Sequence, residues 1–188
     1  MTTAMISRDP SACSPETSYG PGREVILTET EIRRLLPMYR EDAVFLKHAI
    51  LSDGRLSAVF NTFDHPFSRP LPKHFTREHA LVFITQASYV LGSLMQIVDP
   101  MWPLGTEEFQ RLAMAEQATF TRVDLRFRRF VRNRDGITLN IWCTGFRRMG
   151  GRLFARFAFD FPDGCYGACE GLVALDDSLR PGLSELSH

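Results

Sequence analysis

The stretch KHFTREHALVFITQASYVLGSLMQIV, residues 73–98, decides the fold of this chain. Its apolar side chains recur at helical spacing and extend around most of the circumference: Leu81, Val82, Ile84, Tyr89, Leu91, Leu94, Met95 and Val98. A helix that is apolar on nearly all sides must be covered on nearly all sides, so we expect it to be central. Thr76 is the expected N-cap, and Asp99-Pro100 marks the end of the helix.

Composition indicates one globular domain. The chain has 188 residues, 44% hydrophobic content and 15 Phe, enough for one good core. The central helix is too polar to span a membrane comfortably, because it carries Thr85, Gln86, Ser88 and Gln96. No signal segment is recognisable and the four cysteines show no disulfide spacing, so a cytoplasmic location is expected. No zinc-type ligand spacing is present, and we expect neither a metal nor another cofactor.

Two segments before the central helix carry clear local signals. Thr28 is followed three residues later by Glu31, a capping-box pattern that predicts a short helix over residues 27–36. Two apolar runs, residues 43–51 and 56–63, are separated by Ser-Asp-Gly. This arrangement predicts a β-hairpin.

After the central helix the pattern changes from helix to strand. Residues 106–116 predict a short helix capped by Thr106, with acids in its first turn. Beyond it the apolar period becomes two, which predicts four strands in a meander: residues 119–131, 137–144, 152–161 and 165–175.

This order of elements predicts an α+β hotdog fold. A single antiparallel sheet curled around one long apolar helix is the economical way to bury both. We expect the hotdog domain over residues 25–176, a disordered arm over residues 1–24 and a polar tail over residues 177–188. The sheet has edges that another chain can pair with, so a homodimer is expected.

Charge is distributed unevenly although the net charge is zero. Between residues 117 and 160 there are ten Arg and three Asp. One interpretation is a solvated outer sheet face. The other is a docking surface for an anionic partner, such as an acyl carrier protein or the phosphates of coenzyme A, with Arg126 and Arg128 as the contacts. Nucleic acid is not expected, because no helix-turn-helix, zinc finger or RRM-like signature accompanies the arginines.

The loop before the central helix is the best candidate for a site. Residues 64–74, DHPFSRPLPKH, hold three prolines within seven residues and are therefore stiff. They deliver His65, Ser68 and Arg69 close to the start of the helix. A proline-rich crossing loop without any catalytic role is the alternative interpretation.

Four phrases of the chain also carry a family resemblance. They are Leu36-Pro37-Met38-Tyr39, Lys73-His74-Phe75-Thr76, the helical run Val82-Phe83-Ile84-Thr85-Gln86-Ala87-Ser88-Tyr89, and Arg126-Phe127-Arg128-Arg129. Together they resemble the FcoT-like thioesterases, a hotdog family named for a mycobacterial long-chain acyl-CoA thioesterase. The likeness runs from about residue 27 to residue 175. The chain is most similar to a branch of this family from actinobacterial secondary metabolism. Members of that branch add glycine to an α,β-unsaturated acyl thioester and then hydrolyse the thioester.

The resemblance implies particular site residues. The family's catalytic tyrosine ahead of the first strand falls on Tyr39, and its second tyrosine falls on Ser68. Its two asparagines fall on Thr76 and Thr85, so these two and Ser68 are expected to bind substrate. His65 stands where the thioesterase has an acid. Because only Tyr39 is kept, the resemblance favours the glycine-adding branch over plain long-chain acyl-CoA hydrolysis.

The residue types suit that chemistry. Both steps place negative charge on the thioester oxygen, which the N-terminus of the Thr76 helix can stabilise with N–H groups and its dipole. We expect His65 to be the base, since histidine titrates near neutrality. Tyr39 would orient the thioester, and Arg69 would hold the carboxylate of the amine donor.

Three other functions remain open at this stage. One is a plain fatty acyl thioesterase acting on coenzyme A or carrier thioesters. The second is a hotdog hydratase or dehydratase, which would need an acidic partner, and Glu78 is the nearby candidate. The third is a module that binds an acyl carrier protein without catalysis.

Overall fold

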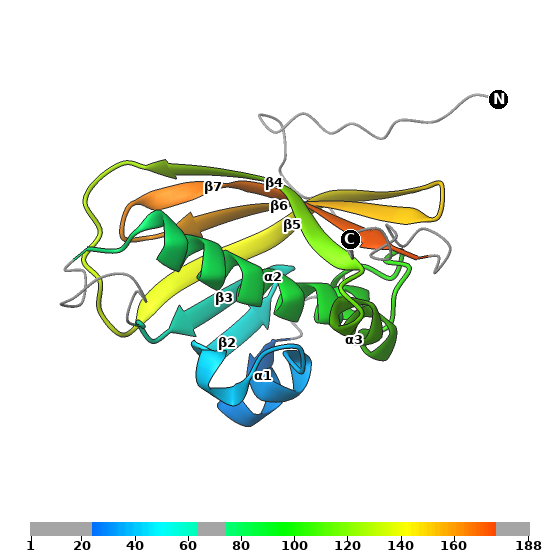
Figure 1. Ribbon diagram of the computed structural model, residues 1–188, viewed down its shortest axis with the longest axis horizontal. Coiled ribbons are helices and arrows are strands. Elements are labelled where there is room, and N and C mark those ends of the chain that lie inside the picture. The colour runs from blue at the N-terminus through cyan, green and yellow to red at the C-terminus, as the bar shows by residue number, and fades with distance from the viewer. Residues whose placement is uncertain (1–23, 64–73, 176–188) are drawn as a thin grey trace, which may run out of the picture.

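The structure, a computed structural model, describes residues 24–63 and 74–175 of the 188-residue chain. A seven-stranded antiparallel sheet curls around one long helix, α2 (Figure 1). The predicted α+β hotdog fold is confirmed. The elements are β1 Val25–Leu27, α1 Glu29–Leu35, the 3-10 turn η1 Glu41–Ala43, β2 Leu46–Ser52, β3 Arg55–Phe60, α2 Arg77–Val98, α3 Thr106–Met114, β4 Ala118–Phe127, β5 Ile137–Met149, β6 Arg152–Phe161 and β7 Cys165–Ala174.

Helix α2 is central, as its sequence predicts. Thr76 is the N-cap and the helix ends at the C-cap Asp99. Of its 22 residues, 13 are buried, and the exposed ones lie in its first and last turns. By length and composition alone α2 could cross a membrane, but 61% of its most apolar window is buried inside the fold. This burial identifies α2 as a core helix.

An aromatic cluster packs the first half of α2 against the sheet. Phe83 of α2 stacks on Phe60 of β3 with ring centroids 4.2 Å apart. Phe75, just before the helix, lies 5.6 Å from Phe83 and 5.2 Å from Phe161 of β6. Aromatic rings bury large apolar areas, so this cluster fixes the helix across β3 and β6.

The strands follow the order β1-β2-β3-β5-β6-β7-β4. The predicted meander is wrong for β4, which pairs with β7 and not with β5. After α2 the chain passes through α3 to the far edge of the sheet, and β5 then enters beside β3 (Figure 1). Both β1 and β4 are therefore edge strands.

Register shifts interrupt three of the strand pairs. They fall between Leu46 and His48 in β2, between Phe120 and Arg122 in β4, and between Cys143 and Gly145 in β5. A β-bulge bends its strand and increases the local twist. These shifts let the sheet curl around α2 instead of lying flat beside it.

The local signals at the start of the chain hold. The capping box of Thr28 and Glu31 is present at α1. The hairpin of β2 and β3 turns at Asp53 and Gly54, both with positive φ. Strand β1 was missed, because three residues are too short to show an alternating pattern.

Several predicted boundaries are wrong. The predicted strand 137–144 continues to Met149 as β5, and the strand predicted over residues 43–51 begins only at Leu46 as β2. The predicted strand 119–131 ends at Phe127, because the chain then leaves the sheet and the Val131 carbonyl accepts a hydrogen bond from the Phe75 N–H at 2.8 Å. Thr106 does not cap α3. Gly105 is the N-cap, and the Thr106 hydroxyl donates instead to the Ser93 carbonyl of α2 at 2.6 Å.

A buried amide joins α2 to the start of β2. Gln86 is fully buried, and its Oε1 accepts hydrogen bonds from the N–H groups of Phe45 at 3.0 Å and Leu46 at 3.2 Å. Its Nε2 donates to the Ala43 carbonyl at 2.6 Å. One side chain thus satisfies three backbone groups that precede and begin the strand.

Replacing Gln86 should destabilise the fold far more than replacing the half-buried Gln110. Gln86→Leu leaves those three backbone groups without a partner, and we expect the free energy of unfolding to fall by about 2–4 kcal/mol. Gln110→Leu is the matched control, because Gln110 makes one exposed hydrogen bond to the Arg34 carbonyl. Its effect should stay within about 0.5 kcal/mol. Urea denaturation measures both, and equal losses would contradict this role of Gln86.

Candidate functional site

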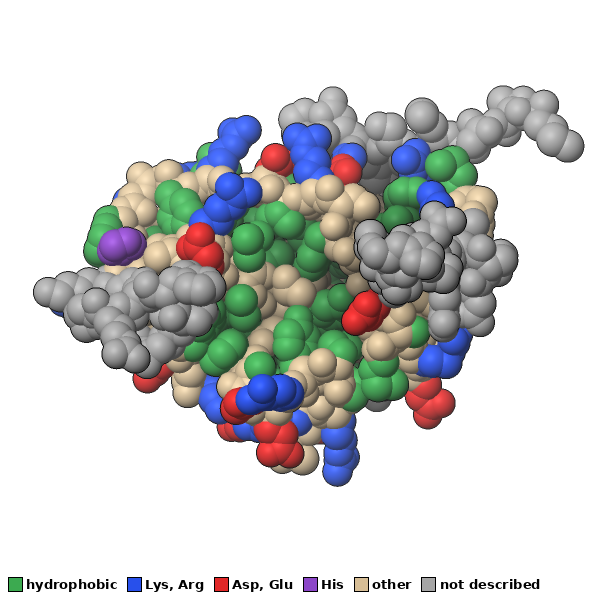
Figure 2. Space-filling model, in the orientation of Figure 1, with side chains coloured by type: hydrophobic (Ala, Val, Ile, Leu, Met, Phe, Trp, Pro, Cys, Tyr) green, Lys and Arg blue, Asp and Glu red, His purple; other side chains and the backbone are tan. Residues whose placement is uncertain are grey.

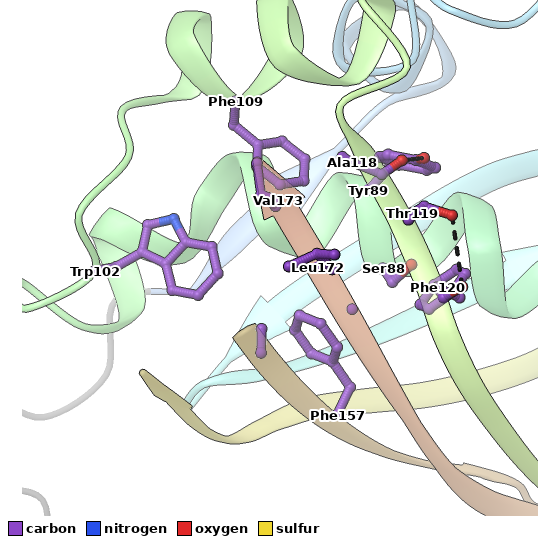
Figure 3. A pocket seen from close by; sticks show the side chains of 12 residues that line it. Ser88, Tyr89, Trp102, Phe109, Ala118, Thr119, Phe120, Phe157, Leu172 and Val173 are labelled. Carbon is purple, nitrogen blue, oxygen red and sulfur yellow. Dashed lines mark hydrogen bonds between the residues drawn. The ribbon is translucent and has the colours of Figure 1, made fainter. Parts of the chain in front are cut away.

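An apolar pocket lies between α2 and the sheet, near the place where α3 and β4 meet α2 (Figure 3). Its volume is about 30 Å³, room for about two water molecules. Its wall combines small side chains with aromatic ones: Ser88, Tyr89, Trp102, Phe109, Ala118, Thr119, Phe120, Ala155, Phe157, Gly171, Leu172 and Val173. On the face shown in Figure 2, hydrophobic side chains gather at the centre, with charged side chains around the rim.

The pocket is closed at one end and more open at the other. Trp102 and Phe109, on the α3 side, are only 2% and 5% exposed. On the β4 side, Thr119 is exposed and Phe120 is half-buried. Figure 3 shows these two pairs at opposite sides of the pocket. An apolar chain would therefore enter beside β4 and end against Trp102 and Phe109.

Few polar atoms face this wall. The Ser88 hydroxyl donates to the Thr85 carbonyl at 2.8 Å, and the Tyr89 hydroxyl donates to the Ala118 carbonyl at 2.8 Å. The indole N–H of Trp102 is buried and has no hydrogen-bond partner among the described residues. A buried donor of this kind is expected to bond to water or to a ligand oxygen.

Tyr39 lies behind Tyr89, next to the pocket. The two rings meet edge to face with centroids 6.3 Å apart. Burial, and to a lesser extent the neighbouring Tyr89, raises the pKa of Tyr39 well above its usual value. The phenol therefore stays protonated at neutral pH and can act as a hydrogen-bond donor but not as a base. The predicted task of orienting a thioester oxygen stays a prediction.

Thr85 lies on the same side of α2 as Tyr89, about 6 Å earlier along the helix. Its hydroxyl donates to the Leu81 carbonyl at 2.7 Å. That hydrogen is thus used within the helix, and only the oxygen lone pairs of Thr85 remain for a substrate. The sequence predicted a substrate contact here, which stays a prediction.

Thr76 performs a structural task at the start of α2. Its Oγ1 accepts the N–H of His79, and its own N–H donates to His79 Nδ1 at 3.3 Å. The other ring nitrogen, Nε2, lies 3.2 Å from the Phe63 carbonyl. Since a backbone N–H can only donate and a carbonyl can only accept, Nδ1 is the acceptor and Nε2 carries the proton. His79 is a fully buried capping residue.

His79 was missed by the sequence reasoning. The signal was available, because it stands three residues after the N-cap Thr76, where a capping box places its second member. The usual residue there is Glu or Gln, so a histidine escapes the pattern. Its two ring nitrogens are both engaged within the fold, at Thr76 and at the Phe63 carbonyl.

The predicted site residues do not all lie close together in the structure. Tyr39 and Thr85 lie near the pocket, whereas Thr76 lies about 20 Å from Tyr89 along the helix axis, at ~1.5 Å per residue. The oxyanion role predicted for the helix N-terminus and the role predicted for Tyr39 therefore fall at separate places. His65, Ser68 and Arg69 lie outside the described residues.

Arg126 and Arg128 lie on the outer side of the sheet, away from α2. Arg126 pairs across strands with Tyr166, which in turn pairs with Asp160. Asp160 alternates along β6 with the buried Phe159, so this set faces outward. The Arg128 guanidinium lies 4.1 Å from the Tyr166 ring centroid. Hydrogen bonds from Arg128 and Arg126 lower the pKa of Tyr166.

Two other arginines on this outer face are neutralised. Arg156 pairs with Glu170 at 2.8 Å, and Arg122 pairs with Asp124 at 2.9 Å. Within the described residues, Arg126 and Arg128 form no ion pair. The positive charge on this part of the sheet is thus concentrated around Tyr166.

The described cysteines are not candidates for catalysis. Cys165 and Cys169 are buried, and burial raises the pKa of each thiol to about 12. A thiol in that state is a poor nucleophile at neutral pH. No group of three His, Cys, Asp or Glu among the described residues is arranged to hold a metal ion.

Comparisons with known proteins give only distant likenesses. No protein-family model matches the sequence, and a search of curated proteins finds no similar sequence. A thioesterase-superfamily protein of solved structure is 15% identical, with a TM-score of 0.39, over 67% of this chain and 53% of its own. The chain thus spans about half the length of that protein.

Two further solved structures illustrate the range of these likenesses. A sigma28-regulated virulence protein from Campylobacter jejuni is 6% identical with a TM-score of 0.48, over 79% of this chain and 91% of its own. A point mutant of the fluoroacetyl-CoA-specific thioesterase FlK is 13% identical with a TM-score of 0.33, over 82% and 87%. At these identities and TM-scores, the likenesses assign no activity to the chain.

Proposed function

We propose that this protein is an acyl-thioester hydrolase that holds a short acyl group in the pocket between α2 and the sheet. One observation carries the proposal: the pocket is apolar, closed beside α3 and open beside β4, and the ring of Tyr39, a protonated phenol, contacts the wall residue Tyr89. An acyl chain needs an apolar wall, and a thioester oxygen needs a donor near that wall.

Tyr39 supplies that donor in the proposed reaction. Water adds to the thioester carbonyl, and the carbonyl oxygen gains negative charge. The carbon–sulfur bond then breaks, and the departing sulfur takes a proton to leave as a thiol. The Tyr39 O–H, with its raised pKa, can donate a hydrogen bond to the oxygen without losing its proton. The acyl group is released as a carboxylate whose second oxygen comes from the water.

We further propose that glycine adds to the acyl group before hydrolysis. The resemblance of the Tyr39 and Thr76 phrases to the glycine-adding branch supports this step. The amine of glycine forms a bond to the β-carbon of an α,β-unsaturated thioester, the oxygen carries the enolate charge, and the α-carbon takes the proton that the amine loses. His65 would move that proton and Arg69 would hold the glycine carboxylate, as the sequence predicts.

Incubation with a crotonyl thioester, with and without glycine, tests the proposal. We expect release of free thiol in both cases, and in the presence of glycine a product heavier than crotonate by one glycine. Mass spectrometry separates these products. A hydratase would instead give a mass increase of one water with the thioester intact. A protein that only binds the carrier would leave the thioester unchanged, and that result would contradict the proposal.

Tyr39→Phe sharpens this test. Removing a donor that serves both steps should lower adduct formation and hydrolysis by a similar factor, on the order of 10- to 100-fold. Tyr166→Phe is the matched control, because it removes a phenol from the opposite side of the sheet and should leave both rates unchanged. Equal rates for wild type and Tyr39→Phe would exclude Tyr39 from the reaction.

We propose that Arg126 and Arg128 contact an acidic acyl carrier protein, since their charges are not neutralised by described acids. Reversing both charges should raise KM for a carrier-bound substrate by at least about tenfold and leave KM for a small thioester unchanged. Reversing Arg122 and Arg156, which pair with Asp124 and Glu170, changes the net charge equally and is the control. Equal effects of the two double variants would count against specific docking.

We also propose that the protein is a homodimer that pairs through β4. The outer edge of β4 has no neighbouring strand in the described sheet, and its inner-face residue Phe127 is 43% exposed. Light scattering should give twice the chain mass of 21.4 kDa at micromolar concentration. Leu125→Lys, on the inner face of β4, should shift the protein toward monomer, whereas Asp124→Lys on the outer face should not. A wild-type mass of 21.4 kDa would refute the dimer.

A further inference from the structure

Phe109 reaches from α3 onto α2 and forms part of the closed end of the pocket. Its ring centroid lies 6.1 Å from that of Tyr89, and the side chain is 5% exposed. A Cβ placed on Gly92 would lie 2.5 Å from Phe109 Cζ, closer than such atoms approach. The ring therefore occupies a notch on α2 that only glycine leaves open.

Neighbouring contacts hold Phe109 in that notch. The Thr106 hydroxyl, three residues earlier on α3, donates to the Ser93 carbonyl of α2 at 2.6 Å. Beside Phe109, Trp102 is 2% exposed and its ring meets Phe146 edge to face with centroids 5.1 Å apart. Because α3 is bonded to α2 and Trp102 is packed against Phe146, both residues of the closed end are held in place.

The size of the pocket determines how far an apolar chain can extend toward this closed end. At about 30 Å³ the pocket holds about two water molecules, so it offers an apolar chain little length. On the β4 side the wall reaches the surface at Thr119, so a longer chain could lengthen the occupied space only past Phe109 or Trp102. Of the two, Phe109 projects from a separate helix and is the residue whose truncation joins the pocket to the notch over Gly92.

We propose that Phe109 limits the acyl-chain length of this protein by closing the pocket at its α3 end. The substrate class in this inference rests on the proposed acyl-thioester function. The position of the limit rests on the ring in the Gly92 notch and on the closed end of the pocket.

Phe109→Ala should admit longer chains. Binding is measured by calorimetry with two non-hydrolysable coenzyme A thioethers, S-butyl-CoA and S-octyl-CoA, and turnover with butyryl-CoA and octanoyl-CoA. We expect wild type to favour the four-carbon compounds. In Phe109→Ala the octyl-to-butyl ratio of affinity, and the corresponding ratio of kcat/KM, should rise by about tenfold or more, since one methylene in an apolar pocket is worth about 10–200-fold.

Leu112→Ala is the matched control. Leu112 lies on α3, is 1% exposed and does not line the pocket, so its truncation also creates a cavity under the helix. It should leave the chain-length ratios unchanged. Phe109→Leu, a milder truncation, should move the ratios in the same direction as Phe109→Ala and keeps the test available if the alanine variant does not fold.

The outcomes separate the inference from the proposed function. A changed ratio of thioether binding without hydrolysis by any variant supports the chain-length role and overturns the hydrolase proposal. Hydrolysis with the same ratios in wild type and both Phe109 variants overturns the chain-length role alone. The chain-length role is also overturned if neither thioether binds wild type or any variant. An octyl-to-butyl ratio that changes as much in Leu112→Ala as in Phe109→Ala overturns it too.

Discussion

Burial of α2 is the constraint on which the rest of the structure depends. A 22-residue helix with 13 buried residues can be stable in water only if other elements cover it along most of its length. The curled sheet provides that cover, and the bulges in β2, β4 and β5 let it curl. Gln86 then fixes the cover in position, because its buried amide needs the backbone groups of residues 43–46 as partners.

The pocket follows from how that cover changes along α2. In the first half of the helix, Phe83 stacks closely on Phe60 of β3. Farther along, small residues stand opposite it on three strands: Ala118, Ala155 and Gly171. Trp102 and Phe109 close this space on the side of α3. The same burial that stabilises the fold thus leaves an apolar site of limited length, with Tyr39 behind its wall.

Local patterns predicted much of the fold. The apolar circumference of residues 77–98 gave the position of α2, and Thr76 marked its start. The alternation over Arg152–Phe161 fixed β6 to the residue. Strand pairing was less accessible, because the alternation in β4 is the same whether it neighbours β5 or β7. Only the path of the chain through α3 decides that choice.

The candidate site was harder to predict than the fold. Tyr39 was predicted from a resemblance, and the structure places its ring against Tyr89, a residue of the pocket wall. Trp102 and Phe109 carry no local signal, since each is an ordinary apolar residue until the fold brings it against α2. The notch at Gly92 is informative only together with Phe109, 17 positions later in the chain.

Nuclear magnetic resonance of the tryptophan indoles tests the central claim that the acyl group occupies this pocket. The chain has two Trp. Trp102 lines the pocket, whereas Trp142 lies on the outer face under Arg55, 4.2 Å from its guanidinium. Titrating ¹⁵N-labelled protein with S-butyl-CoA should shift the Trp102 indole N–H signal and leave that of Trp142, assigned with Trp142→Phe, unchanged. Saturable binding that leaves Trp102 unchanged, or shifts Trp142 instead, would contradict the account.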